Sequence, residues 1–183
     1  MQKDNKSLAY IFFRYTALAL LAIGNLKLFY IVFTPLTIYP VYFVLKIMYN
    51  CILIGTDTIF IKGYYAQIIP ACVAGAAYYF LLILNLTTPM PIRKRIYSIL
   101  FFFAGFLAVN ILRIIVFSNL MFKGYQYFDL THKLTWYFGS TIFVVFLWFF
   151  SVHLFNIKNI PLWTDIKTIV SHIKPEEHHK HGH

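Results

Sequence analysis

Three side chains suited to acyl transfer, Cys72, Arg113 and His132, occur in otherwise apolar surroundings. A thiolate is a nucleophile, and a position in the first turn of a helix beside a cation lowers the pKa of a cysteine. A guanidinium donates hydrogen bonds to a developing oxyanion, which matters most in a water-poor site. Imidazole titrates near neutrality and passes protons to a leaving amine. These residue types indicate a thiol enzyme if the fold brings them together.

Arg113 lies inside a run, residues 97–119, that is apolar enough to span a bilayer. Asn110 is three residues earlier and therefore shares its helix face, where we expect it to orient the guanidinium. A charge in a spanning segment normally faces a protein interior or a wet cavity, although an arginine can also snorkel to lipid phosphates. If the basic cluster 93–95 marks the cytoplasmic interface, Arg113 is about 27 Å further along at about 1.5 Å per residue. It would then lie near the external face of a core about 30 Å thick.

The elements that carry Cys72 and His132 place both at the same depth. Proline is favoured at the first helical position, so Pro70 begins a helix with Cys72 in its first turn. The last span, about 132–155, has His132 in its first turn and Asp129 or Thr131 as a cap. Short connections make successive helices antiparallel neighbours. Close approach of the backbones is permitted by small residues at 71, 75, 104, 105 and 108.

The composition places this chain in a membrane. Of its 183 residues, 60% are hydrophobic and 12% are charged, and the mean hydropathy is +0.69. Several separate apolar segments exclude a soluble domain with one anchor. The net charge of +10 could suggest nucleic acid, but the positive residues sit at segment ends and in the C-terminal tail. Membrane topology explains them better, and we expect no nucleic-acid partner.

We therefore predict an all-α, multi-pass transmembrane helical bundle with about five spans. The expected spans are 8–33, closed by Thr34-Pro35, then 36–54, 70–86, 97–119 and 132–155. Residues 55–69 predict a short hairpin-like excursion on the membrane surface, just before the cysteine helix. Residues 1–155 form the transmembrane domain. Residues 156–183 form a basic, His-rich cytoplasmic tail with an amphipathic piece at 161–173.

The orientation of the N-terminus stays open. The basic loop 87–95 is cytoplasmic by the positive-inside rule, which makes the connection 120–130 external. Five spans with an internal C-terminus require an external N-terminus, whereas Lys3, Lys6 and Arg14 favour an internal one. The first apolar run is long and lacks an evident cleavage site, so we expect no cleavable signal peptide.

The two cysteines, Cys51 and Cys72, form no C-x-x-C pair, which argues against a redox dithiol or a thiolate zinc site. A disulfide between them would mask the candidate nucleophile, so we expect Cys51 to be a buried small apolar residue. We expect no metal and no cofactor. His153 is expected at the membrane interface. Weak metal binding is conceivable in the tail, which we interpret as a solvated, low-complexity end, through His178, His179, His181 and His183.

Each residue of the candidate site also has an interpretation that involves no catalysis. A lone cysteine among apolar residues is usually an inert core residue, and a lone histidine at a helix end is more often a cap. Their coincidence at one depth with Arg113 favours an enzyme. The alternative is a non-enzymatic small transporter or assembly factor in which Arg113 binds an anionic ligand or a lipid headgroup. Such a protein would not need Cys72.

The segment PACVAG (70–75), the motif NILRI (110–114) and the histidine in DLTHKL resemble the exosortase/archaeosortase family, as does the stretch 55–69. The resemblance covers about residues 36–150. It differs at Val73, where Ser or Thr is commoner, and the chain lacks the extra spans of larger members.

The resemblance implies a membrane cysteine transpeptidase or protease whose active site faces the extracytoplasmic side. Its expected partners are exported proteins with a C-terminal sorting signal, composed of a short motif, a spanning helix and a basic cluster. Cleavage near the motif passes the new carboxyl end to a lipid or other surface acceptor. By matching position, Cys72 would be the nucleophile, Arg113 the stabilising arginine and His132 the third member, where some relatives carry arginine.

Overall fold

The computed structural model describes residues 2–24 and 26–157, and most of them are helical. The helices are α1 (Gln2–Ile23), α2 (Lys27–Tyr49), α3 (Pro70–Val73), α4 (Gly75–Thr87), α5 (Ile92–Phe122), α6 (Phe128–Leu134) and α7 (Ser140–Leu154). One π-helical turn, Thr135–Gly139, joins α6 directly to α7. The predicted amphipathic piece at 161–173 and the four tail histidines lie outside the described residues.

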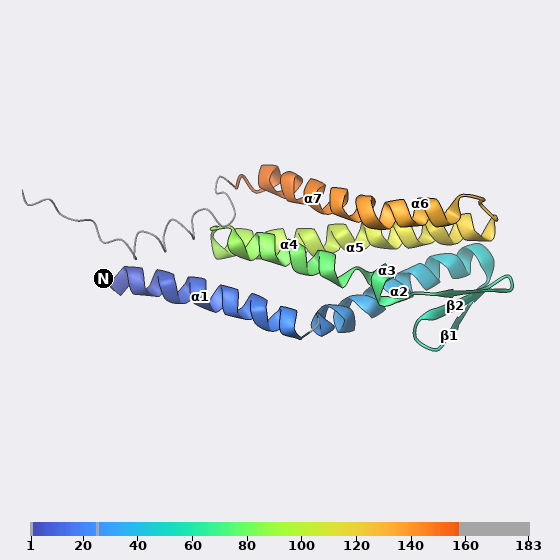
Figure 1. The fold of residues 1–183 in the computed structure, drawn as a ribbon, viewed down its shortest axis with the longest axis horizontal. Coiled ribbons are helices and arrows are strands. Elements are labelled where there is room, and N and C mark those ends of the chain that lie inside the picture. Colours follow the sequence, from blue (N-terminus) through green and yellow to red (C-terminus); the bar gives the residue numbers. More distant parts are fainter. Residues whose placement is uncertain (1, 25, 158–183) are drawn as a thin grey trace, which may run out of the picture.

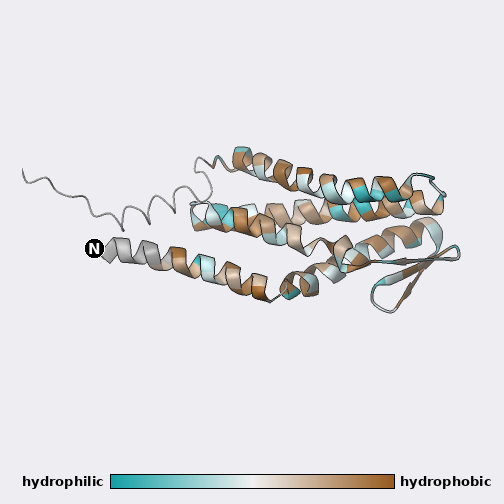
Figure 2. Cartoon of the chain, viewed as in Figure 1, coloured by the Kyte–Doolittle hydropathy of each residue, from teal (hydrophilic) through white to brown (hydrophobic). Residues whose placement is uncertain are grey.

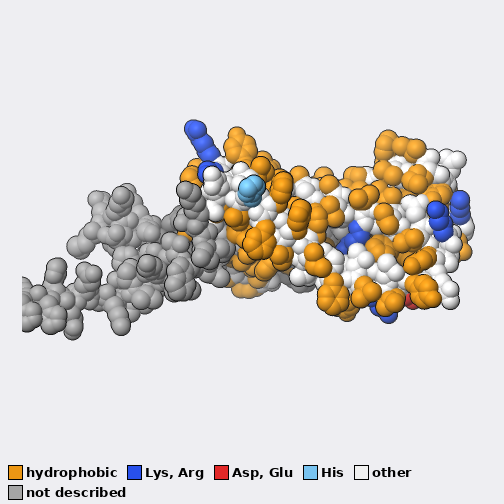
Figure 3. Space-filling view, turned by 90° about the horizontal axis from the view of Figure 1, so that it is seen from above, with side chains coloured by type: hydrophobic (Ala, Val, Ile, Leu, Met, Phe, Trp, Pro, Cys, Tyr) orange, Lys and Arg blue, Asp and Glu red, His pale blue; other side chains and the backbone are white. Residues whose placement is uncertain are grey.

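Four helical segments are long and apolar enough to cross a membrane: Lys27–Tyr49, Pro70–Thr87, Ile92–Phe122 and Phe128–Leu154. The apolar part of α1, Ile11–Ile23, is shorter. Hydrophobic residues occur along every long helix (Figure 2). On the face shown in Figure 3, apolar side chains predominate, and Lys and Arg lie mostly toward the two ends apart from one basic patch in the middle. The predicted multi-pass helical bundle is confirmed, with four such segments in the described part of the chain rather than about five.

The expected boundary between the first two helices is wrong. The break lies at Leu26, whose backbone is left-handed (φ 56°), and not at Thr34-Pro35. Gly24, a weak helix former, precedes the break. Pro35 and Pro40 lie inside α2, because neighbouring groups in a bundle can satisfy the carbonyls that a proline leaves free. As a result α1 and α2 follow one another along the long axis of the molecule (Figure 1).

The molecule has two distinct ends. The start of α1, the α4–α5 connection and the end of α7 lie at one end, and the sheet and the C-terminal ends of α2 and α5 lie at the other (Figure 1). At the first end, Lys94 Nζ donates to Phe155 O (2.9 Å), just after α7. The buried Arg95 donates to Asn85 O (2.8 Å) and Thr88 O (3.1 Å), at the end of α4. Two members of the basic cluster thus stabilise the carboxyl ends of two helices.

The predicted hairpin is present and has a third strand. Strands β1 (Ile52–Ile54), β2 (Thr58–Ile61) and β3 (Tyr64–Gln67) form an antiparallel sheet in the order β1-β2-β3. Positive φ angles at Gly55 (65°) and Gly63 (89°) permit the turns. One face of the sheet packs on α2 through a buried cluster of Ile38, Val41, Leu45, Cys51, Ile59, Ile61 and Ile68, and partly buried residues of α5 pack against this cluster. Cys51 is buried there, as predicted.

A second hydrophobic core joins the start of α2 to α4, α5 and α7. Phe33 stacks on Tyr78 with ring centroids 3.7 Å apart, and both rings are buried. Gly75 admits the Tyr30 ring, because a Cβ at this position would lie 2.8 Å from Tyr30 Cζ. The small residue at position 75 therefore allows α4 to begin directly against α2.

Candidate functional site

Cys72 lies on α3, a single helical turn between the sheet and α4. Pro70 begins this turn as predicted, after Ile69 in an extended conformation. The expected continuous helix is interrupted, because Ala74 is left-handed (φ 59°, ψ 45°) and α4 resumes only at Gly75. The break interrupts the regular pattern of helical hydrogen bonds beside Cys72 and Val73. The carbonyls of these two residues therefore need other donors. The thiol is partly exposed and forms no disulfide.

Two side chains of α5 supply these donors. Asn110, which is 3% exposed, donates from Nδ2 to Cys72 O (2.8 Å) and to Val73 O (3.4 Å). Arg113 donates from Nη2 to Cys72 O (3.2 Å). The asparagine and the arginine thus meet at one carbonyl oxygen, and together they fix the backbone of the cysteine to the middle of the bundle.

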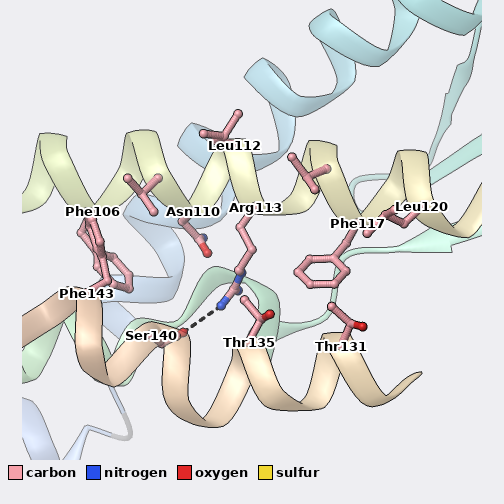
Figure 4. Close-up of a pocket in the computed structure, with 13 residues that line it drawn as sticks. Phe106, Asn110, Leu112, Arg113, Phe117, Leu120, Thr131, Thr135, Ser140 and Phe143 are labelled. Atoms are coloured by element: carbon pink, nitrogen blue, oxygen red, sulfur yellow. Dashed lines mark hydrogen bonds between the residues drawn. The ribbon is translucent and has the colours of Figure 1, made fainter. Parts of the chain in front are cut away.

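Ser140 is a further member of this group that the sequence analysis missed. Arg113 Nη1 donates to Ser140 Oγ (2.9 Å), and the guanidinium extends from α5 toward the first turn of α7 (Figure 4). Ser140 directly follows the π-helical turn, a feature that often marks functional sites. The sequence signal was the small pair Gly139-Ser140 inside an apolar helix, which permits close approach to a neighbouring helix.

The structure brings the three predicted side chains to common cavities. Cys72, Arg113 and His132 all line a cavity of about 290 Å³ whose outer wall includes Trp136 and Tyr137. The same three residues line a second cavity of about 280 Å³, between β3, α5 and α6. Arg113 also lines a third cavity.

The third cavity has a volume of about 430 Å³ and lies between α5 and the α6–α7 segment. Its walls are largely apolar, and Phe106 and Phe143 lie at one end (Figure 4). Its polar lining includes Arg113, Ser140 and Asn110, whose buried Oδ1 has no hydrogen-bond partner.

His132 lies on α6 with an exposed side chain. Its ring stacks on Phe128 (centroids 5.6 Å apart, 7° between planes) and meets Phe117 edge-on (5.2 Å, 71°). These rings hold the imidazole at the cavity wall. In the described part of the chain, no hydrogen bond joins His132 to Cys72. Catalytic hydrogen bonds commonly tighten only when substrate binds.

The two cysteines have different surroundings. Cys51 Sγ lies against Tyr42 O (3.8 Å), and burial raises the pKa of its thiol, which favours the protonated, unreactive form. Cys72 instead opens to two cavities beside a cation. Of the two thiols, the geometry favours Cys72 as a nucleophile.

Residues 2–24 and 26–157 contain no group of three or more His, Cys, Asp or Glu side chains placed to hold a metal ion. No protein-family model matches the chain, and neither the curated proteins nor the solved structures contain a match. A functional interpretation therefore depends on the residues themselves and on their geometry.

Proposed function

We propose that this protein is a membrane-embedded cysteine transpeptidase or protease that cleaves C-terminal sorting signals of exported surface proteins and transfers them to a lipid or surface acceptor. The observation that carries the proposal is the meeting of Cys72, Arg113 and His132 at the same two cavities, from three different helices. The order of these residues, with Asn110 three positions before the arginine, also resembles exosortases and archaeosortases.

The sheet supports an extracytoplasmic position for this site. Lipid-exposed sheet edges do not occur in the hydrocarbon core, so the free edges of β1 and β3 indicate that the sheet end of the molecule lies outside it. The opposite end carries the basic cluster and is cytoplasmic by the positive-inside rule. Helix α5 has 31 residues and is about 46 Å long, whereas the core is about 30 Å thick. Its last turns then extend beyond the core, and Arg113 lies near the outer interface.

This orientation also gives a simple topology. Because α1 and α2 follow one another along the long axis, they form one kinked crossing (Figure 1). Together with α4, α5 and the α6–α7 segment, the chain crosses four times and begins on the cytoplasmic side. The positive charges of Lys3 and Lys6 then agree with the positive-inside rule.

The chemistry proceeds in two acyl transfers. His132 takes the thiol proton, and the thiolate of Cys72 attacks the carbonyl carbon of the scissile peptide bond. The imidazolium returns the proton to the leaving amine as the carbon–nitrogen bond breaks, which leaves a thioester. An acceptor amine or hydroxyl then gives its proton to His132 and attacks the thioester, and the C–S bond breaks to release the thiolate, which takes the proton back from His132. Water in place of the acceptor makes the reaction a hydrolysis.

Arg113 has the geometry to stabilise the oxyanion of both transfers. A guanidinium carries five N–H groups, and the two hydrogen bonds that Arg113 donates, to Cys72 O and Ser140 Oγ, leave N–H groups to donate elsewhere. Fixed donors of this kind need no reorganisation when charge develops on the substrate carbonyl.

The test is processing of a co-expressed exported protein that ends in a motif, a spanning helix and a basic cluster. Cys72→Ala and Cys72→Ser should abolish the shift in size of this protein without changing the membrane level of the enzyme. Cys51→Ala is the matched control, because it removes the other thiol from a buried site, and it should process normally. Full processing by Cys72→Ala would refute a covalent thiol mechanism.

The 430 Å³ cavity favours one alternative, a non-enzymatic membrane protein that binds an anionic ligand or lipid headgroup through Arg113. In that case Arg113→Ala would abolish binding of the anionic ligand or lipid headgroup, and Cys72→Ala would not. The two variants therefore separate a thiol enzyme from a binding protein.

A further inference from the structure

We propose that the free edge of β3 binds the backbone of the substrate, so that an extended segment beside the scissile bond joins the sheet as a fourth strand. This inference rests on the proposed function and adds the mode of substrate recognition. It follows from the hydrogen-bond register of the sheet and from the cavity that borders β3.

The register shows which backbone groups of β3 are free. In the β2–β3 ladder Thr58 is opposite Gln67, and Ile68 N donates to Asp57 O (2.8 Å). Opposed pairs in an antiparallel ladder alternate between hydrogen-bonded and non-hydrogen-bonded. The pairs at Ile68, Ala66 and Tyr64 are therefore bonded to β2. The N–H and C=O groups of Tyr65 and Gln67 point away from β2, toward the free edge.

A ring contact agrees with this assignment. Side chains approach more closely at non-hydrogen-bonded pairs, and the rings of Phe60 and Tyr65, which are opposed in the ladder, have centroids 4.9 Å apart. Tyr65 and Gln67 together present two donors and two acceptors at the spacing of alternate strand residues, which is the spacing that an extended peptide matches.

The free edge borders the cavity of the cysteine. Residues 65–68 form one wall of the 280 Å³ cavity, which also contains Cys72, Arg113 and His132. Phe117 and Ser118 of α5 also line this cavity. Because β3 runs through Ile69 into α3, a strand paired with β3 would enter the cavity of the thiol.

The other edge of the sheet, formed by β1, does not border the cavities of Cys72. Thr58 and Phe60 are the residues of β2 whose N–H and C=O groups point toward β1, so the pairs Ile54–Thr58 and Ile52–Phe60 are hydrogen-bonded. Leu53 lies between these two pairs, and its N–H therefore points outward. No residue of β1 lines either cavity of Cys72. Proteins commonly protect exposed edges with prolines or charges, and β3, with the sequence YYAQ, has neither. The edge of β3 is thus both open and adjacent to the thiol.

Proline substitution tests the edge directly. Gln67→Pro removes an outward N–H without removing a bond to β2, as edge strands tolerate. Gln67→Ala keeps the N–H but loses the side-chain bond from Nε2 to Asp57 Oδ2 (3.0 Å). We expect Gln67→Pro to process the co-expressed surface protein about tenfold more slowly than Gln67→Ala, since a lost hydrogen bond of about 1.4 kcal/mol corresponds to that factor. Leu53→Pro makes the same deletion on β1 and should process the substrate faster than Gln67→Pro.

Alkylation of Cys72 by iodoacetamide shows whether each variant has kept its site. Equal processing by Gln67→Pro and Gln67→Ala, with Cys72 alkylated normally in both, would overturn the edge proposal. This outcome differs from a failure of the proposed function. Processing by Cys72→Ala would refute the thiol mechanism, whereas equal processing by the two Gln67 variants would refute only binding of the substrate at the edge of β3.

A second measurement covers a proline variant that fails to fold. Ser118 lines the same cavity as β3, and p-benzoylphenylalanine at position 118 in a Cys72→Ala protein should cross-link the surface protein. We expect the cross-links to map to the residues beside the scissile bond. Cross-links confined to the spanning helix of the surface protein, or no cross-link, would contradict binding at β3.

Discussion

Replacing Asn110 by leucine tests whether α5 sets the position of the cysteine. The wild-type side chain donates to Cys72 O and to Val73 O, and Val73 is only 1% exposed. Leucine has a similar size but no donor. An unsatisfied buried acceptor costs about 1–3 kcal/mol, and hydrogen bonds measured inside a membrane protein average about 0.6 and reach about 1.7 kcal/mol. We therefore expect the free energy of unfolding to fall by about 1–2 kcal/mol.

Asn85→Leu is the matched control for this prediction. Asn85 is fully buried on α4, and its Nδ2 donates to Ser98 Oγ (2.9 Å) of α5, near the α4–α5 connection. Both variants should lose similar stability in detergent unfolding. Only Asn110→Leu should slow processing, by about tenfold, as expected for about 1.4 kcal/mol at the transition state. Equal processing losses in the two variants would show that Asn110 only stabilises the fold and does not position the thiol.

Three further changes have definite outcomes. Arg113→Lys should nearly abolish processing, because lysine lacks the planar fork that reaches two acceptors at once; wild-type turnover would reduce Arg113 to a generic charge. Gly75→Val should lower the thermal midpoint because its side chain overlaps the Tyr30 ring, and Tyr30→Ala should restore it; no change in the midpoint would contradict this packing. Two side-chain hydrogen bonds lower the pKa of Asp57. The stabilisation that they give the folded state is therefore complete above the ordinary pKa of an aspartate, and it is lost as the pH falls through the lowered pKa. Amide exchange at Ile68, corrected for its intrinsic rate, should accelerate over that range in the wild type but not in Asp57→Asn; parallel profiles would exclude Asp57 as the cause.

The sequence predicted those parts of the fold that follow from local patterns. Apolar runs identified α5 and the α6–α7 segment (Phe128–Leu154) within about five residues of their observed bounds, and Pro70 correctly marked the start of the cysteine helix. The hairpin predicted at 55–69 contains the observed β2–β3 pair. The position of Arg113 along its helix followed from counting, since α5 is continuous from Ile92 to Phe122.

The remaining features depend on contacts between distant segments. Proline 35 indicated a boundary, but neighbouring helices support α2 across it, and the chain breaks at Leu26 instead. The left-handed Ala74 has no local signal, and the carbonyls of Cys72 and Val73 beside it accept hydrogen bonds from side chains about forty residues away on α5. Ser140 was missed for a related reason: its partner Arg113 reaches it from another helix, and the π-helical turn before it cannot be inferred from composition.

The most direct test of the account is the capture of the acyl group on Cys72. Neutral hydroxylamine, added to membranes that contain the enzyme and its co-expressed surface protein, attacks a thioester and leaves a hydroxamate on the released carboxyl end. We predict a surface protein that ends in a hydroxamate at the cleavage site, detected by mass spectrometry, and the loss of this product in Cys72→Ala. Cleavage at the same site without any hydroxamate, continuing in Cys72→Ala, would contradict it.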